Sequence, residues 1–122
     1  MNLPDDLLYI AEHQWLRRGD EVTIGITDHA QEELGDLVAI ELPAVGSRVV
    51  ADAVCGSVES AKTVSDISSP VTGIVTEHNG AALDDPTIVN DFPYSTGWLF
   101  RVAAEADGSL LTADEYRRSL AV

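Results

Sequence analysis

The chain has 122 residues, a length that fits one domain and leaves little room for a second core. Its residues are 45% hydrophobic and 23% charged, which excludes a chain that is disordered throughout. The 21 Asp and Glu outnumber the 7 Lys and Arg, and the formal net charge is −14. Because this charge repels phosphate backbones and anionic lipid headgroups, we expect no nucleic acid and no membrane partner.

The cysteine content and the first residues indicate the compartment. Cys55 is the only cysteine, so the chain forms no internal disulfide, and no cluster of Cys and His residues has the spacing of a metal site. Residues 1–6 lack the basic and apolar regions of a secretion signal, and no run of about 18 apolar residues occurs. We expect a cytoplasmic monomer that binds no metal.

The residue pattern predicts a mainly β fold. Most segments alternate polar and apolar residues with a period of two and end at Gly, Pro, Asn or Asp, as short strands of an antiparallel sandwich or barrel do. The first hairpin is expected to begin near Leu7, to include Trp15, to turn at residues 18–20 and to return along residues 21–27. A second turn is predicted at residues 43–46.

A short helix is predicted directly after the first hairpin. Asp28 is expected to be its N-cap and Gly35 its left-handed exit, which gives about two turns covering one sheet edge. The next strand is expected at residues 36–42, with three apolar side chains on one face: Val38, Ile40 and Leu42.

The second half of the chain contains a hairpin with a lysine in its turn. Strands are predicted at residues 54–60 and 64–68, and Lys62 lies between them. The remaining elements are expected to be a strand at residues 71–77, a helix-tending segment from 79 to 90, and a late strand containing Trp98, Phe100 and Val102.

A terminal helix is predicted from about Ala113 to Leu120. Thr112 and Glu115 have the spacing of a capping box, in which each side chain bonds to the backbone N–H of the other residue. Leu111 and Tyr116 occupy the two positions of a hydrophobic staple around this cap.

Lys62 is the only lysine of the chain, because the other six basic residues are arginines. A genome that favours arginine codons explains the missing lysines but not the one that is present. Only a lysine amine can be deprotonated and acylated, whereas arginine suits a solvated surface equally well. An acyl group at a hairpin tip becomes a flexible arm that a compact domain presents to several enzymes in turn. The alternative from the residues alone is an ordinary exposed lysine in a polar turn.

The residues around Lys62 resemble those of a known family. The lipoylation region of glycine cleavage system H-proteins is similar to residues 56–66 (Gly-Ser-Val-Glu-Ser-Ala-Lys-Thr-Val-Ser-Asp) and 69–73 (Ser-Pro-Val-Thr-Gly). Further segments follow the family's order over nearly the whole chain: residues 13–15, 24–31, 34–36, 41–43, 89–90 and 97–98. The resemblance implies one lipoyl-carrier domain over residues 1–122. Its fold is expected to be a flattened barrel or sandwich of short antiparallel strands, as in lipoyl and biotinyl carriers, with one short helix in the N-terminal half and a C-terminal helix.

The resemblance also implies a cofactor site. Lys62 is expected to carry lipoate in amide linkage, and Glu59 and Gly73 are expected to help the lipoylating enzyme recognise the hairpin. Physical reasons agree, because Glu59 offers a charge beside the tip and Gly73 permits close backbone approach. Taken alone, these two residues are also explained as a solvated carboxylate and a bulge glycine.

As a member of this family, the chain is expected to be a carrier and not an enzyme. It would receive the aminomethyl group of glycine from the pyridoxal-phosphate decarboxylase (P-protein) and pass it to the aminomethyltransferase (T-protein). The dihydrolipoamide dehydrogenase (L-protein) would then reoxidise the arm. A lipoate ligase or a lipoyl/octanoyl transferase is the further expected partner. Cys55 needs no part in this chemistry, because the reacting sulfurs belong to the lipoyl group.

The loaded arm carries a cationic amine that is easily lost to water, so the resemblance implies a cleft that shelters it. Four residues are candidates for this cleft by position: Glu12, Gln14, His29 and Asp66. Gln14 departs from the family, which usually has glutamate there, and Glu12 is expected to share its strand face and to replace the missing charge. Outside the resemblance, His29 and Asp66 are also explained as a surface histidine and a turn residue.

Other functions explain the residues less well. A biotin carrier is expected to have methionines beside the modified lysine, where this chain has Ala61 and Thr63. A purely structural interaction domain needs no lysine at the tip, and an enzyme would show a catalytic triad order, a metal cluster or a phosphate-binding glycine loop. A lipoyl relay that donates its cofactor to 2-oxoacid dehydrogenase subunits remains open.

Overall fold

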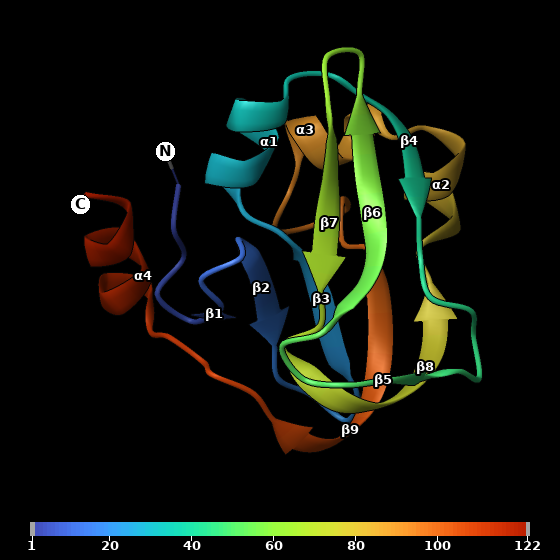
Figure 1. The fold of residues 1–122 in the computed structure, drawn as a ribbon, viewed down its shortest axis with the longest axis vertical. Coiled ribbons are helices and arrows are strands. Elements are labelled where there is room, and N and C mark those ends of the chain that lie inside the picture. Colours follow the sequence, from blue (N-terminus) through green and yellow to red (C-terminus); the bar gives the residue numbers. More distant parts are fainter. Residues whose placement is uncertain (1, 122) are drawn as a thin grey trace.

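The computed structural model describes residues 2–121 and shows a mainly β fold with four short helices among these residues (Figure 1). The strands are β1 (Leu8–Tyr9), β2 (Gln14–Arg17), β3 (Val22–Ile26), β4 (Leu37–Glu41), β5 (Arg48–Val49), β6 (Val54–Ser60), β7 (Val64–Ser68), β8 (Val71–His78) and β9 (Phe100–Asp107). The helices are α1 (Asp28–Leu34), α2 (Gly80–Asp84), α3 (Thr87–Asp91) and α4 (Ala113–Leu120). None of the described helices is long and apolar enough to cross a membrane.

Two antiparallel sheets form a sandwich. One sheet has six strands in the order β1-β2-β3-β9-β8-β5, and the other has three in the order β4-β6-β7. The β6–β7 hairpin lies in front of β3 and β9, and its turn extends beyond the end of the sheet (Figure 1). Val58 and Ile67 of the small sheet belong to the same buried cluster as Ile24, Val75 and Phe100 of the large one. The apolar core therefore lies between the two sheets, as the predicted sandwich requires.

The first predicted hairpin is confirmed, but the cap of the following helix is displaced by one residue. β2 and β3 pair antiparallel, with Gln14 opposite Ile26. Thr27, not Asp28, is the N-cap of α1, because its extended backbone lets Oγ1 accept a hydrogen bond from the N–H of Ala30 at 3.2 Å. Asp28 is the first residue of the helix. The helix ends at the predicted Gly35, whose φ of 78° and ψ of −163° lie in a region that essentially only glycine adopts and not in the expected left-handed helical one.

The predicted apolar face of β4, with Val38, Ile40 and Leu42 on one side, is wrong at Val38. The pairing of β4 with β6 shifts register between Leu37 and Ala39, so this strand contains a bulge that interrupts the alternation. Leu37 is consequently buried at 2% exposure, whereas Val38 is 56% exposed. Ile40 and Leu42 pack against the core as expected.

The later elements follow the sequence closely. β6 and β7 have the predicted bounds, and the helix-tending segment contains the two short helices α2 and α3. The late strand β9 begins at Phe100, so Trp98 precedes it. The two-residue strand β5, which pairs with β8, had no sequence signal of its own.

The C-terminal helix α4 packs at one side of the sandwich. Its capping box is present, with the N–H of Glu115 donating to Thr112 Oγ1 at 3.2 Å and the N–H of Thr112 donating to Glu115 Oε1 at 2.9 Å. Tyr116 is fully buried in a second apolar cluster, in which it stacks on Tyr9 at 4.9 Å between ring centroids. The partly buried Leu111 packs against the same cluster. This cluster attaches α4 to β1 and β2.

Candidate functional site

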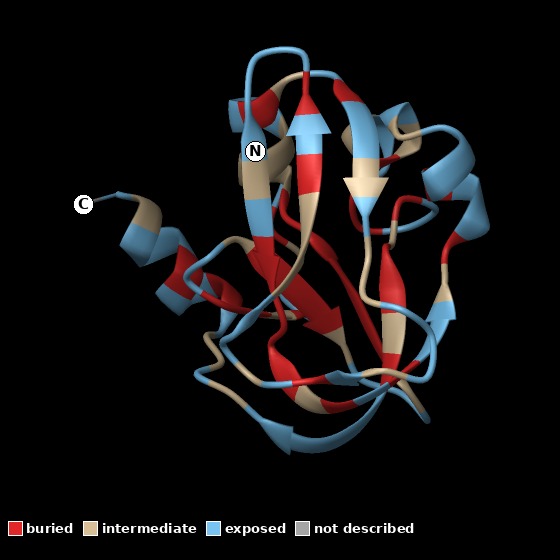
Figure 2. Cartoon of the chain, turned by 45° about the vertical axis from the view of Figure 1, so that its right-hand side comes forward, coloured by how far each residue is buried: buried red, intermediate tan, exposed pale blue. Residues whose placement is uncertain are grey.

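The turn between β6 and β7 holds Lys62 at an exposed tip. The N–H of Ser60 donates to the carbonyl of Thr63 at 2.8 Å and closes the turn. The buried Oγ of Ser60 accepts hydrogen bonds from the N–H of Lys62 at 3.4 Å and of Thr63 at 3.3 Å. Residues 61–64 are exposed, as the pale blue tip in Figure 2 shows. Hydrogen bonds therefore hold the backbone of the turn, and Lys62 lies exposed at its tip.

The side chain of Lys62 runs beside the end of α1. A Cβ built on Gly35 would lie 3.7 Å from Cε and 3.9 Å from Nζ of Lys62. Asn90 of α3 fixes this end of the helix, because its Nδ2 donates to the Gly35 carbonyl at 2.9 Å and its Oδ1 accepts from the N–H of Leu37 at 3.0 Å. The sequence marked Asn90 only as part of a short motif, and its bracing role was not predicted.

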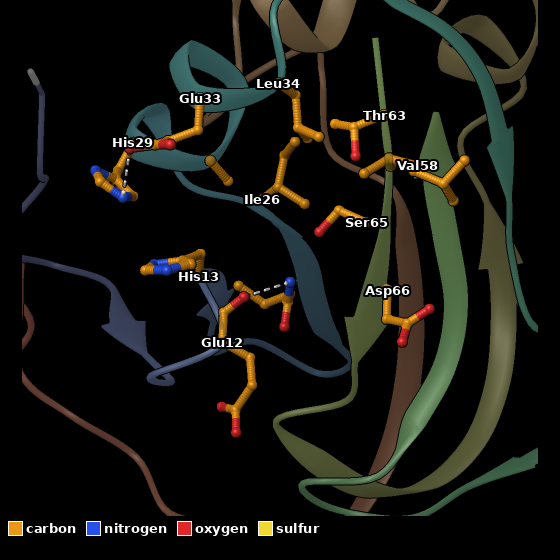
Figure 3. A pocket seen from close by; sticks show the side chains of 13 residues that line it. Glu12, His13, Ile26, His29, Glu33, Leu34, Val58, Thr63, Ser65 and Asp66 are labelled. Atoms are coloured by element: carbon orange, nitrogen blue, oxygen red, sulfur yellow. Dashed lines mark hydrogen bonds and ion pairs between the residues drawn. The ribbon is translucent and has the colours of Figure 1, made fainter. Parts of the chain in front are cut away.

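A cleft of about 380 Å³ opens between β7 and the segment that contains α1 and the start of β2. Its lining includes all four predicted residues: Glu12, Gln14, His29 and Asp66. His13 and His29 lie on one side of it, and Thr63, Ser65 and Asp66 lie on the other (Figure 3). Because Thr63 and Val64 directly follow Lys62, the cleft begins beside the lysine tip.

The charges of the cleft suit a cation. The lining includes three acidic residues, Glu12, Glu33 and Asp66, and no lysine or arginine. Glu33 lies beside His29, whereas the side chains of Glu12 and Asp66 point away from the space between His13 and Ser65 (Figure 3). His29 Nε2 lies 3.6 Å from Glu33 Oε1, and the ring centroids of His13 and His29 are 4.7 Å apart. Burial, and then the neighbouring His29, lower the pKa of His13 below its usual value, so His13 is neutral at neutral pH.

Gln14 forms the floor of the cleft and is only 2% exposed. Its Nε2 donates to the backbone carbonyl of Glu12 at 3.0 Å, and its Oε1 accepts from the N–H of Ser68 at 3.2 Å. The expectation that Glu12 and Gln14 share a strand face is wrong, because Glu12 precedes β2 and His13 between them has a φ of 77°. Both residues line the cleft nevertheless, through a turn instead of a strand.

The two residues expected to guide lipoylation lie apart. Glu59 is exposed on β6 opposite Val64, next to the hairpin turn. Gly73 is buried in β8 of the other sheet, where an added Cβ would overlap the carbonyl oxygen of Ala103. Cys55 is partly buried in β6, and burial raises the pKa of its thiol to about 11. Cys55 is therefore a neutral thiol at neutral pH.

Two lining residues with titratable side chains, His13 and Glu33, were not among the predicted cleft residues. His13 is adjacent to Gln14, and Glu33 follows His29 by one helical turn. The spacing of His29 and Glu33 could have predicted Glu33 as a cleft residue, because residues at i and i+4 lie on the same helix face. His13 had no such signal, since its place depends on a turn with positive φ.

Comparisons with known proteins agree with this geometry. The family described as "Glycine cleavage H-protein" matches residues 7–121. The chain is 52% identical to the glycine cleavage system H protein of Rubrobacter xylanophilus, with 97% of this chain and 94% of the relative covered. It is 50% identical to that of Streptomyces avermitilis, with 95% of each chain covered.

Among solved structures, a crystal structure of a glycine cleavage system H protein from Mycobacterium marinum matches with a TM-score of 0.94 and 45% identity. The match covers 98% of this chain and 99% of that one. The chain therefore belongs to the glycine cleavage H-protein family, the non-catalytic lipoyl carriers of the glycine cleavage system.

Proposed function

We propose that Lys62 carries lipoate in amide linkage and that the adjacent cleft shelters the aminomethyl cargo of the arm. The observation that carries this proposal is the placement of the only lysine at a fixed, exposed hairpin tip beside an acidic cleft. When bound, the lipoyl group supplies a disulfide that accepts the cargo and is reduced in doing so. The residues present fit such a group, because the amine is accessible and the cleft begins next to it.

The cleft residues bind the cargo through charge. The acidic residues around the cleft, Glu12, Glu33 and Asp66, attract a protonated amine, and an amine that keeps its proton has no lone pair with which to expel the sulfur. Ile26, Leu34 and Val58 provide the apolar part of the lining, which limits access of water. The chain thereby protects the cargo between enzymes and contributes no catalytic group.

The partners we propose are the P-, T- and L-proteins and a lipoylating enzyme, either a ligase or a lipoyl/octanoyl transferase. We assign Glu59 direct contact with the lipoylating enzyme, because this residue is exposed beside the tip. Gly73 is buried in the other sheet, so we assign it an indirect role in the sheet geometry that supports the hairpin.

The test is to co-express the chain with a lipoylating enzyme and lipoate, and to measure intact mass followed by peptide mapping. A single lipoyl addition on Lys62 is expected, with none on the Lys62→Arg variant, which keeps the positive charge. An unmodified Lys62, in an experiment where a control substrate is lipoylated, would refute the assignment. Biotin on Lys62 would instead support the biotin-carrier alternative.

A further inference from the structure

One hydroxyl group outside the cleft connects two of its walls. Tyr116 of α4 is fully buried, and its hydroxyl oxygen lies 2.7 Å from His13 Nδ1 and 2.8 Å from Thr27 Oγ1. His13 lines the cleft, and Thr27 is the N-cap of α1, the helix that contributes His29 and Glu33 to the same cleft. The C-terminal helix is thus bonded to both segments through a single atom.

The direction of these hydrogen bonds follows from the surroundings of Thr27. Its side chain is fully buried, and its Oγ1 already accepts from the N–H of Ala30 at 3.2 Å. The hydroxyl hydrogen of Thr27 therefore needs an acceptor, which the Tyr116 oxygen provides. Tyr116 in turn donates to His13, so Nδ1 of His13 is the acceptor and its ring proton is on Nε2.

This arrangement disfavours a charged His13. A doubly protonated ring carries a hydrogen on Nδ1, which reverses both bonds and leaves the buried hydroxyl of Thr27 without an acceptor. The titratable groups that face His13 are His29 and Glu33 from α1, Glu12 from its own segment and Tyr116 from α4. The neighbouring Glu33 and Glu12 favour a charged ring. Burial, His29 and the hydrogen bonds that run from Thr27 through Tyr116 to His13 oppose it.

We propose that Tyr116 is a positioning residue, whose hydroxyl adds to burial in keeping the His13 ring neutral and links that ring to the N-cap of α1, so that the C-terminal helix controls how long the cleft retains a cationic amine. The inference rests on the proposed function of the cleft. His13 and His29 are the two lining residues whose side chains can acquire a positive charge. A positive charge on His13 would repel the amine and weaken its retention.

The Tyr116→Phe variant tests this role, because it keeps the ring that stacks on Tyr9 and removes only the hydroxyl. The matched control is Tyr9→Phe, which loses a hydrogen bond of the same length, from Tyr9 Oη to the Pro4 carbonyl at 2.7 Å, and leaves His13 bonded. The rate at which the loaded protein loses its aminomethyl group is measured at about pH 6 and at about pH 8, on either side of the ordinary histidine pKa, together with unfolding in urea.

At about pH 6, Tyr116→Phe is expected to lose the aminomethyl group about fivefold faster than the parent, the effect of the hydrogen bond to His13 alone, and Tyr9→Phe to lose it at the parent rate. At about pH 8, where His13 is neutral with or without this bond, the three proteins are expected to lose it at similar rates. Similar losses of stability in both variants, with an unchanged rate in Tyr116→Phe, would reduce Tyr116 to a structural residue and overturn the proposal.

A second readout is independent of the cofactor. Nitrogen NMR of the unmodified parent is expected to show His13 Nδ1 without a proton and as a hydrogen-bond acceptor, and this signature is expected to disappear in Tyr116→Phe. A proton on Nδ1 of the neutral parent would contradict the inferred direction. If Lys62 accepts no lipoate, the proposed function fails, while this measurement still tests the hydrogen-bond chain.

If Tyr116→Phe does not fold, His13→Asn tests the same contact from its other end. Asparagine tolerates the positive φ of this position and does not titrate. Acidification is expected to speed loss of the aminomethyl group more in the parent than in His13→Asn. The same acceleration in both proteins would show that His13 has no part in retention.

Discussion

At the scale of single residues, Gln14 is an uncharged, buried side chain that links two segments of the cleft lining. Both ends of its side-chain amide form hydrogen bonds within the protein. Nε2 donates to the backbone carbonyl of Glu12, and Oε1 accepts from the N–H of Ser68. The residue is therefore a brace between the β2 segment and the end of β7. The acidic residues around the cleft are instead Glu12, Glu33 and Asp66.

The Gln14→Glu substitution is predicted to strengthen retention and to weaken the fold. The new carboxylate still accepts from the N–H of Ser68, but it repels the Glu12 carbonyl to which Nε2 now donates. We expect slower loss of the aminomethyl group and a decrease in unfolding free energy of about 1 kcal/mol. Ser95→Glu, which adds the same charge at an exposed position outside the cleft lining, is the control. Equal aminomethyl lifetimes in both variants would contradict a charge effect at position 14.

His13 is predicted to make stability depend on pH. The pKa of His13 is lower in the folded protein than its ordinary value of about 6.5, so below that pH the unfolded chain binds more protons. The unfolding free energy should therefore fall as pH decreases through about 6.5, and the fall should be smaller in His13→Asn. Urea unfolding between about pH 8 and about pH 5 measures the two slopes. Identical slopes would show that His13 titrates alike in both states.

At the scale of elements, local signals predicted those strands and helices whose limits are set by local chemistry. The capping box fixed the start of α4, and turn residues delimited β6 and β7. Prediction failed where tertiary pairing decides. The bulge in β4 depends on β6, and β5 exists because it pairs with two residues of β8.

The candidate site divides in the same way. The family resemblance identified Lys62 and four residues that line one cleft. It did not identify the bond between His13 and Tyr116, which joins residues 103 positions apart in the sequence. Asn90 likewise acts across 55 positions, on the Gly35 carbonyl. Such contacts carry no periodicity, so only the folded structure shows them.

The bulge in β4 predicts unequal effects at two neighbouring positions. Leu37→Ala is expected to cost roughly 2–4 kcal/mol of unfolding free energy, because it leaves a cavity in the core. Val38→Ala should change it by less than about 0.5 kcal/mol, since this side chain is exposed. Urea unfolding of both variants is the measurement. A larger loss of unfolding free energy in Val38→Ala than in Leu37→Ala would indicate that the alternation is uninterrupted and would refute the bulge.

Gly73 is predicted to act through the sheet. In Gly73→Ala the new Cβ meets the Ala103 carbonyl, so β8 and β9 must separate, at a cost of about 2 kcal/mol or more. Gly80→Ala, where an added Cβ meets nothing within 4 Å, should be neutral or slightly stabilising. We expect lipoylation of Gly73→Ala to fall with the folded fraction of the variant, which circular dichroism measures in parallel. A fully folded variant that resists lipoylation would instead indicate direct recognition of Gly73.

At the scale of the whole molecule, the apolar clusters that stabilise the fold are separate from the hairpin tip that presents Lys62. One core between the two sheets supports the protein, and a second cluster attaches the C-terminal helix to the side where His13 lines the cleft. The hairpin tip projects beyond both. A net charge of −14 gives such a carrier a long-range attraction for any partner with a basic docking surface.

Glycine cleavage reconstituted from the P-, T- and L-proteins with the lipoylated chain tests the carrier role of Lys62 directly. We predict glycine-dependent reduction of NAD with the parent protein and none with Lys62→Arg, whose fold and charge should match the parent because the side chain is exposed. Activity of the Lys62→Arg variant at the parent rate would contradict the claim that this chain acts through an arm on its only lysine.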